Sequence, residues 1–247
     1  MALTDLGTAA EVLVATGHDP FARSSLRRPM VRGWAGERAT AWLGVDPDDR
    51  TPYLSTLGAP EDVAALLAEL LPELPPRQRV TVPRGTPARL PAWVGMDGTH
   101  WDFRWLGAPP PVQPGEERVA PEPDERAVKE LLAASSPTAS AQPGDEKVNS
   151  WVGVREDGLL IACAADTSGS TGVGHLSSLA VLPTHRGRGL AKAVTAALTR
   201  QLFAEGLDTV TLGMYASNDA GRGVYDALGF ADEHRFTSGP LQVRGRW

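Results

Sequence analysis

A glycine-containing joint, Arg186-Gly187-Arg188-Gly189-Leu190-Ala191, carries the clearest chemistry in the sequence. Glycine has no side chain, so the backbone can turn sharply at Gly187 and Gly189 and a ligand can approach the amides closely. If a helix begins here, its first N–H groups lack intrahelical partners and lie at the positive end of the helix dipole, which attracts an anion. The joint therefore predicts a phosphate or pyrophosphate site to which Arg186 and Arg188 add positive charge.

The residues on either side predict the elements that hold this joint. Residues 175–182 are apolar at most positions and are followed by Pro183, which is typical of a buried strand that ends there. After the joint, apolar residues recur at three- and four-residue steps as far as Phe203, the pattern of an amphipathic helix. The joint is thus expected to connect a strand to a helix.

Three other interpretations of the joint compete. A Walker loop requires Gly-Lys-Ser/Thr, whereas this chain has Gly189-Leu190-Ala191, so that interpretation fails. A dinucleotide fingerprint is matched only in part, because Lys192 stands where a third glycine belongs and the strand expected at 208–215 ends without an acidic residue. An ordinary tight turn with exposed arginines remains open on these residues alone.

A second segment, residues 218–230, narrows the choice. Asn218 suits a helix N-cap, and Gly229 suits the end of that helix. Together the two segments resemble the GNAT superfamily of acyl-CoA N-acyltransferases. The signature of that family is a strand ending in an apolar triplet, Arg/Gln-x-x-Gly-x-Gly/Ala, a helix, a strand, and an Asn-led helix with a tyrosine before Leu-Gly-Phe. The matching residues, in the expected order, are Leu179-Ala180-Val181, Arg186, Gly189, Ala191, Asn218, Tyr225 and Leu228-Gly229-Phe230. The resemblance covers about residues 150–236 and extends toward Asp124.

The resemblance implies acetyl-CoA as the donor. Its pyrophosphate would lie on the amides of residues 186–191, and its pantetheine would lie along the preceding strand, where the strands before and after the loop splay apart. The amine would attack the thioester directly in a ternary complex, so no enzyme nucleophile is required, and backbone amides would polarise the carbonyl oxygen. The donor contacts implied are Leu179, Ala180, Val181, Arg186, Gly187, Arg188, Gly189, Leu190, Ala191, Asn218 and Tyr225.

Two residues are candidates for proton transfer. Tyr225 occupies the position at which many family members carry the acid that protonates the departing thiolate, although its ring could instead pack against the pantetheine or the core. Histone-type relatives place a glutamate base five residues before the centre of the triplet, and this chain has His175 there. With an ordinary pKa of about 6.5, a histidine suits a base acting through water. A structural histidine at a strand edge is the alternative.

Composition limits the partners. At 247 residues and 42% hydrophobic content, the chain can bury one or two cores, and its net charge of −6 disfavours nucleic acid while suiting a cationic amine. Its one cysteine, Cys163, lies in an apolar run and is expected to be a buried thiol. The histidines show no metal-ligand spacing, and no segment approaches the ~20 apolar residues of a membrane span. We therefore expect a cytoplasmic protein, a monomer or homodimer, without metal, nucleic-acid or membrane partners.

The sequence predicts two domains of α/β class. Proline-rich residues 109–123 are expected to form an extended, semi-stiff linker, because prolines have no amide donor. Residues 124–247 are expected to adopt the GNAT fold, a mixed and mostly antiparallel sheet with splayed central strands flanked by helices, its last strand within 233–243. Residues 1–108 are either a degenerate GNAT-like half without the glycine loop or an unrelated accessory domain. Their expected strands are 38–45, 52–57, 79–83 and 101–106, with a helix over 61–71.

The functional prediction is acetyl transfer from acetyl-CoA to a primary amine of a small molecule, an amino acid or a peptide. A GNAT-fold module that binds acyl-CoA without turnover, as a sensor or partner subunit, is the alternative. Retention of both the glycine loop and Tyr225 favours the enzyme. The expected acceptor loops, 135–147 and 166–174, contain no legible specificity pattern.

Overall fold

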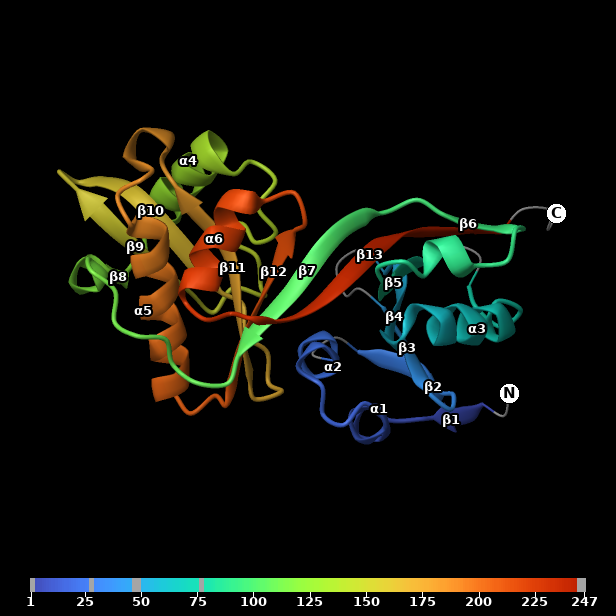
Figure 1. Ribbon diagram of the computed structural model, residues 1–247. Helices are drawn as coiled ribbons and strands as arrows, with labels where there is room; N and C mark the ends of the chain where they lie inside the picture. Colours follow the sequence, from blue (N-terminus) through green and yellow to red (C-terminus); the bar gives the residue numbers. More distant parts are fainter. Residues whose placement is uncertain (1–2, 27–28, 46–49, 76–77, 244–247) are drawn as a thin grey trace. The chain divides into compact units, whose positions relative to one another are not determined.

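In a computed structural model the chain is a mixed α/β protein that divides into two compact units (Figure 1). The structure describes residues 3–26, 29–45, 50–75 and 78–243. Unit 1 comprises Met1–Phe103, Tyr215–Ser217 and His234–Trp247, and unit 2 comprises Arg104–Met214 and Asn218–Glu233. Neither unit is therefore one continuous stretch of sequence.

Unit 2 contains the strands predicted around the glycine joint. Its strand order is β8-β9-β10-β11-β12, antiparallel throughout except for the parallel pair β11 and β12. The prediction of a mixed sheet with flanking helices is confirmed. The strands are β8 (Ala120–Pro121), β9 (Ser150–Glu156), β10 (Leu159–Asp166), β11 (Val173–Val181) and β12 (Thr209–Tyr215), and the helices are α4 (Glu125–Ser135), α5 (Leu190–Ala204) and α6 (Asp219–Ala227).

Two apolar clusters cover the two faces of this sheet. One contains residues of α5 and α6, and the other contains residues of α4. Side chains of β10 contribute to both clusters: Ile161 packs with α5, whereas Leu160 and Cys163 pack with α4. The regular alternation of a strand is interrupted by a register shift between Leu160 and Ala162. The helices α4 and α5 therefore lie on opposite faces, as Figure 1 also shows.

A bulge in β11 changes which residues face α5. Leu176 packs in the α5 cluster, and the regular pairing with β10 is interrupted between Cys163 and Ala165. Ser178, in this irregular stretch, has a φ of 52°. Beyond it Leu179 packs against the α5 cluster. The extra residue thus re-aims the end of β11, as bulges beside functional sites commonly do.

Unit 1 is built around α3, whose apolar face packs on β3, β4 and β5. Its strand order is β1-β2-β3-β4-β5-β13, with β6 paired to β13. Its strands are β1 (Thr4–Leu6), β2 (Met30–Ala35), β3 (Ala39–Val45), β4 (Pro52–Gly58), β5 (Arg79–Pro83), β6 (Val94–Met96) and most of β13 (Asp232–Val243), and its helices are α1 (Ala9–Ala15), α2 (Pro20–Ser25) and α3 (Pro60–Leu70). The strand β7 (Thr99–Leu106) contributes residues to both units.

The two units share an order of elements. In unit 1, β2, β3 and β4 pair antiparallel, and α3 then connects β4 to its parallel neighbour β5. In unit 2, β9, β10 and β11 pair antiparallel, and α5 connects β11 to its parallel neighbour β12. This repetition favours the degenerate GNAT-like half over an unrelated accessory domain.

The proline-rich segment differs from the extended linker expected over residues 109–123. Glu116–Arg118 form a 3-10 turn, and Ala120–Pro121 form β8, which pairs with β9. Proline is tolerated there because β8 is an edge strand, so that its missing N–H interrupts no ladder on the far side. The carbonyl of Pro110 accepts a hydrogen bond from Arg200 of α5 at 3.1 Å. The segment is therefore part of unit 2.

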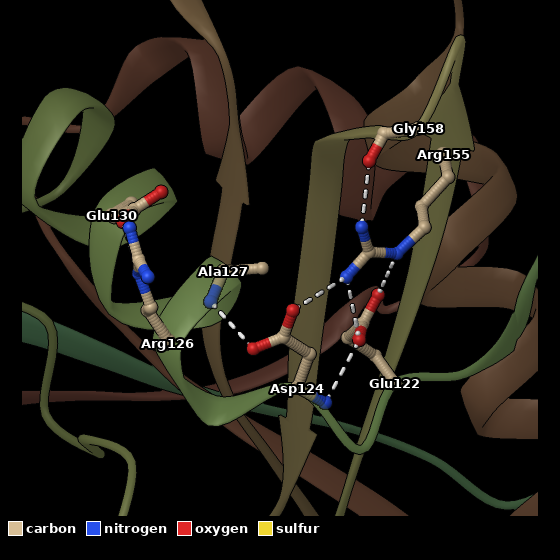
Figure 2. Close-up of polar contacts among 7 residues, drawn as sticks. All are labelled: Glu122, Asp124, Arg126, Ala127, Glu130, Arg155 and Gly158. Carbon is tan, nitrogen blue, oxygen red and sulfur yellow. Dashed lines mark hydrogen bonds and ion pairs between the residues drawn. The ribbon is translucent and has the colours of Figure 1, made fainter.

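Figure 2 shows the polar contacts that fix the end of this segment. The Glu122 carboxylate, whose side chain is only 5% exposed, accepts bonds from Nε of Arg155 at 2.7 Å and from its Nη2 at 3.0 Å. Arg155 also donates to the carbonyl of Gly158 at 2.7 Å. Asp124 caps α4 by accepting from the N–H of Ala127 at 3.1 Å. These contacts tie the start of α4 to the β9–β10 hairpin.

The last strand also differs from the prediction. Residues 233–243 were expected in the C-terminal sheet, but Phe236 to Pro240 of β13 pair with β5 of unit 1. A local sequence pattern can predict a strand without identifying the strand it pairs with, which explains the difference. Within the described residues no helix is long and apolar enough to cross a membrane.

Candidate active site

The glycine joint forms an open loop between β11 and α5. Pro183–His185 make a 3-10 turn after the strand, and Gly187 and Gly189 follow with φ values of 77° and 80°. These are left-handed conformations that favour glycine. A Cβ atom at either glycine would meet no atom within 4 Å. The glycines are therefore needed for backbone conformation, and their surface is open to a ligand.

The loop presents backbone donors. Gly189 is the N-cap of α5 and has no side-chain cap, and its carbonyl accepts the helix's first bond from the N–H of Ala193 at 3.1 Å. In the part of the chain that the structure describes, the N–H groups of Leu190, Ala191 and Lys192 have no bonded partner. Free first-turn donors at the positive end of a helix fit a pyrophosphate. These residues thus suit the acyl-CoA that the resemblance implies.

The two loop arginines behave differently. Arg188, expected to face the donor phosphates, makes a bidentate pair with Glu156 at the end of β9, at 2.9 and 2.6 Å. Glu156 also accepts from Arg118 at 3.1 Å and lies 3.6 Å from Nε2 of His185. The hydrogen bonds from Arg188 and Arg118 lower the pKa of Glu156 to about 2, so it stays charged. Arg188 is therefore already paired with a carboxylate, whereas Arg186 donates at 3.4 Å to the backbone carbonyls of Val181 and Ser135.

Pairing between β11 and β12 stops before β11 ends. Their parallel register runs from Val173 opposite Thr209 to Leu176 opposite Leu212 and goes no further within the described residues. Residues 177–181 thus present an edge toward the side from which β12 has diverged. Leu179 and Val181 there are half-buried against the α5 cluster, while Ala180 is buried in the α4 cluster. An extended ligand could pair with this edge directly before the loop.

The predicted acid, Tyr225, is buried in the α5 cluster together with Leu190 of the loop. Its ring packs edge-on against Phe230, with 6.0 Å between centroids. Burial raises the pKa of Tyr225 to about 12, opposed in part by the positive charge of Arg104. The phenol is therefore protonated at neutral pH and able to donate. Exposed Asn218 caps α6 by accepting from the N–H of Gly221 at 2.9 Å, which positions the helix that carries Tyr225.

The predicted base, His175, lies in the paired part of β11. Its Nδ1 is 2.8 Å from the hydroxyl of Thr211 on β12. Because Leu176 packs toward α5, strand alternation directs His175 to the α4 face of the sheet. The structure thus brings Tyr225, Leu190 and Leu179 together on the α5 face of the sheet, whereas His175 lies on the α4 face.

Three functional candidates were missed in the sequence. Arg104 is buried and pairs with Asp226, the residue after Tyr225, at 2.6 Å. Glu156 gathers the loop cations, and Thr211 contacts His175. Each depends on which strands become neighbours, and no local sequence signal reveals that.

Cys163 and metal chemistry add little to the site. Cys163 is fully buried, and burial raises its pKa to about 12, so the thiol is a core group rather than a nucleophile. Among the described residues, no three or more His, Cys, Asp and Glu side chains are grouped to hold a metal ion.

The chain is similar to known proteins in part of its sequence and in its fold. Residues 151–237 match the family of FR47-like proteins. A mycothiol acetyltransferase of Streptomyces avermitilis is 34% identical over 91 residues, which are 37% of this chain and only 30% of that protein.

Two solved structures resemble nearly the whole chain. A GCN5-related N-acetyltransferase of Sphaerobacter thermophilus is 16% identical with a TM-score of 0.58, covering 99% of this chain and 97% of that one. A putative GNAT-family acetyltransferase of Novosphingobium aromaticivorans is 23% identical with a TM-score of 0.54, covering 85% and 90%. These similarities concern the fold, and they are consistent with a GNAT-like arrangement in both units.

The class defined by the fold and the loop is therefore that of GNAT proteins. More narrowly, residues 151–237, less than half of the chain, match FR47-like proteins.

Proposed function

We propose that the protein transfers an acetyl group from acetyl-CoA to a primary amine of a small molecule, an amino acid or a peptide. The observation that carries this proposal is the open loop at the start of α5, directly after the unpaired end of β11. The loop amides bind the donor pyrophosphate, and residues 177–181 orient the pantetheine. Leu190 of the loop and Tyr225 belong to one apolar cluster, and Leu179 of β11 packs against it.

Bound acetyl-CoA supplies an activated thioester, and the protein supplies proton transfers and orientation. Tyr225 donates its phenolic proton to the departing sulfur, whose pKa of about 8.5 makes this help useful but not indispensable. His175 removes a proton from the incoming ammonium group. A lysine-type amine, with a pKa of about 10.4, is less than roughly a thousandth neutral at pH 7 and needs this base.

Among the described residues of unit 1, the joint that corresponds to the glycine loop does not suit a donor phosphate. At the corresponding joint, Gly58 leads through Ala59 directly into α3, which begins with Pro60 and has no side-chain cap. Proline lacks an N–H group, and Glu61 and Asp62 place negative charge in the first turn. An anion is therefore disfavoured there, and we propose one acetyl-CoA site per chain.

The experiment is to measure thiol release from acetyl-CoA against peptides, amino acids, polyamines and aminoglycosides, together with acetyl-CoA binding by calorimetry. We expect amine-dependent thiol release for at least one class. Binding without release across the whole panel would contradict catalysis and favour the acyl-CoA-binding module. The acceptor of the mycothiol acetyltransferase is not carried over, since this chain spans only 30% of that protein.

A further inference from the structure

One hydroxyl lies between His175 and a backbone carbonyl. Thr211 of β12, directly opposite His175 in the parallel register, is fully buried. Its Oγ1 is 2.8 Å from Nδ1 of His175 and 2.7 Å from the carbonyl oxygen of Gly174. Both distances are those of good hydrogen bonds.

A threonine hydroxyl has a single proton, so only one of these two bonds can use it. The Gly174 oxygen can only accept, and two oxygens 2.7 Å apart without a proton between them would repel each other. The Thr211 hydroxyl therefore donates its proton to the carbonyl oxygen of Gly174, and a lone pair of the hydroxyl oxygen faces Nδ1 of His175. Nδ1 must then carry a proton, and in neutral His175 the lone pair is left on Nε2.

We propose that Thr211 is a positioning residue that holds His175 in the tautomer with its proton on Nδ1, leaving Nε2 to act as the base. The tautomer rests on the geometry alone, whereas the role as base rests on the proposed function. When an ammonium N–H bond breaks and an Nε2–H bond forms, the positive charge moves to the imidazole. The Nδ1–H bond to Thr211 persists, so no hydrogen bond has to be broken or turned for proton uptake.

The backbone of His175 is held on its other side. Its carbonyl accepts from the N–H of Thr167 at 2.8 Å, and its N–H donates to the hydroxyl of Ser168 at 3.0 Å. One charged group joined to this network is Asp166, whose carboxylate accepts from Ser168 and, at 3.0 Å, from Asn149. Hydrogen bonds thus fix the backbone of His175, and the contact between its ring and Thr211 selects the tautomer.

The direct test is a long-range proton–nitrogen NMR spectrum of the uniformly nitrogen-15-labelled full chain at pH 8, with His175→Gln identifying the resonances. We expect the His175 Nδ1 shift of a protonated nitrogen and the Nε2 shift of an unprotonated one. A His175 protonated on Nε2 would overturn the proposal. This readout needs no turnover, so it stays informative if no amine acceptor is ever found.

Kinetics with the accepted amine test the positioning role. Thr211→Val keeps the side-chain shape without the hydroxyl, and we expect kcat to fall about tenfold, the KM for acetyl-CoA to stay unchanged and the tautomer signature to be lost. Thr211→Ser keeps the hydroxyl, so we expect it to retain both the wild-type kcat and the tautomer signature. If the valine variant does not fold, the serine variant still tests whether the hydroxyl is sufficient. Thr209→Val, a buried threonine of the same strand, is the matched control. Equal rates for Thr211→Val and Thr209→Val would overturn the positioning role.

Discussion

Replacement of Gly189 tests the donor site most sharply. Gly189 has a φ of 80°, and a Cβ there meets open space, so a side chain adds backbone strain without a clash. That strain, about 1–2 kcal/mol, is common to Gly189→Ala, Gly189→Gln and Gly189→Glu. Only the glutamate variant adds charge, and the glutamine variant matches it in size.

The magnitude follows from Coulomb's law. A carboxylate about 6 Å from a phosphate charge is repelled by about 0.7 kcal/mol in water and by about 3 kcal/mol at an effective dielectric constant of ~20. We therefore expect Gly189→Glu to bind acetyl-CoA roughly 3- to 100-fold more weakly than Gly189→Gln.

Calorimetry at low and moderate salt measures this difference, and it should narrow as salt increases because exposed charges are screened. Melting temperatures of all three variants show whether the backbone strain is shared. Equal acetyl-CoA affinity for Gly189→Glu and Gly189→Gln at low salt would refute the placement of pyrophosphate on this loop.

Three further outcomes are expected. Tyr225→Phe should lower kcat severalfold while sparing acetyl-CoA affinity, and because the pKa of Tyr225 is about 12, the loss should persist from pH 6 to 9; an unchanged rate would remove its role as an acid. Since the folded pKa of Glu156 is about 2, below its ordinary 4.5, its ion pairs stabilise the fold fully above pH 4.5 and are lost as pH falls through about 2. The difference in melting temperature between wild type and Glu156→Gln should shrink over that range, and a constant difference would contradict the pairing. Glu122→Gln, which removes the buried partner of Arg155, should lower the melting temperature by roughly 5 °C, whereas Glu130→Gln, in an exposed pair, should change it by roughly 1 °C; similar values would contradict the anchoring role of Glu122.

Much of unit 2 could be predicted from local patterns. The apolar run before Pro183, the periodic helix after Gly189 and the Asn218 cap each carry their own signal, and β11, α5 and α6 begin and end within a few residues of the prediction. Ser178 carried no such signal. A positive φ at a serine is set by packing around it, so the bulge that re-aims Leu179 could not be anticipated.

The polar contacts of the site were harder to predict than its elements. His175 was identified from its position in the motif, but its partner Thr211 lies on a strand separated from it by a whole helix. Arg188 was expected to be available to a phosphate, and Glu156 holds it only because the end of β9 lies near the loop. Such pairs depend on the register of strands distant in sequence, which composition and periodicity do not encode.

The pairing of β13 with β5 has a consequence for how the chain folds as it is synthesised. Domains usually fold in the order in which they emerge from the ribosome. Here β5 is made early, but the strand that completes its sheet, Phe236 to Pro240, is made only after every residue of unit 2. Unit 2 can therefore finish folding first, while the edge of β5 waits as an open template that a second nascent chain could also occupy.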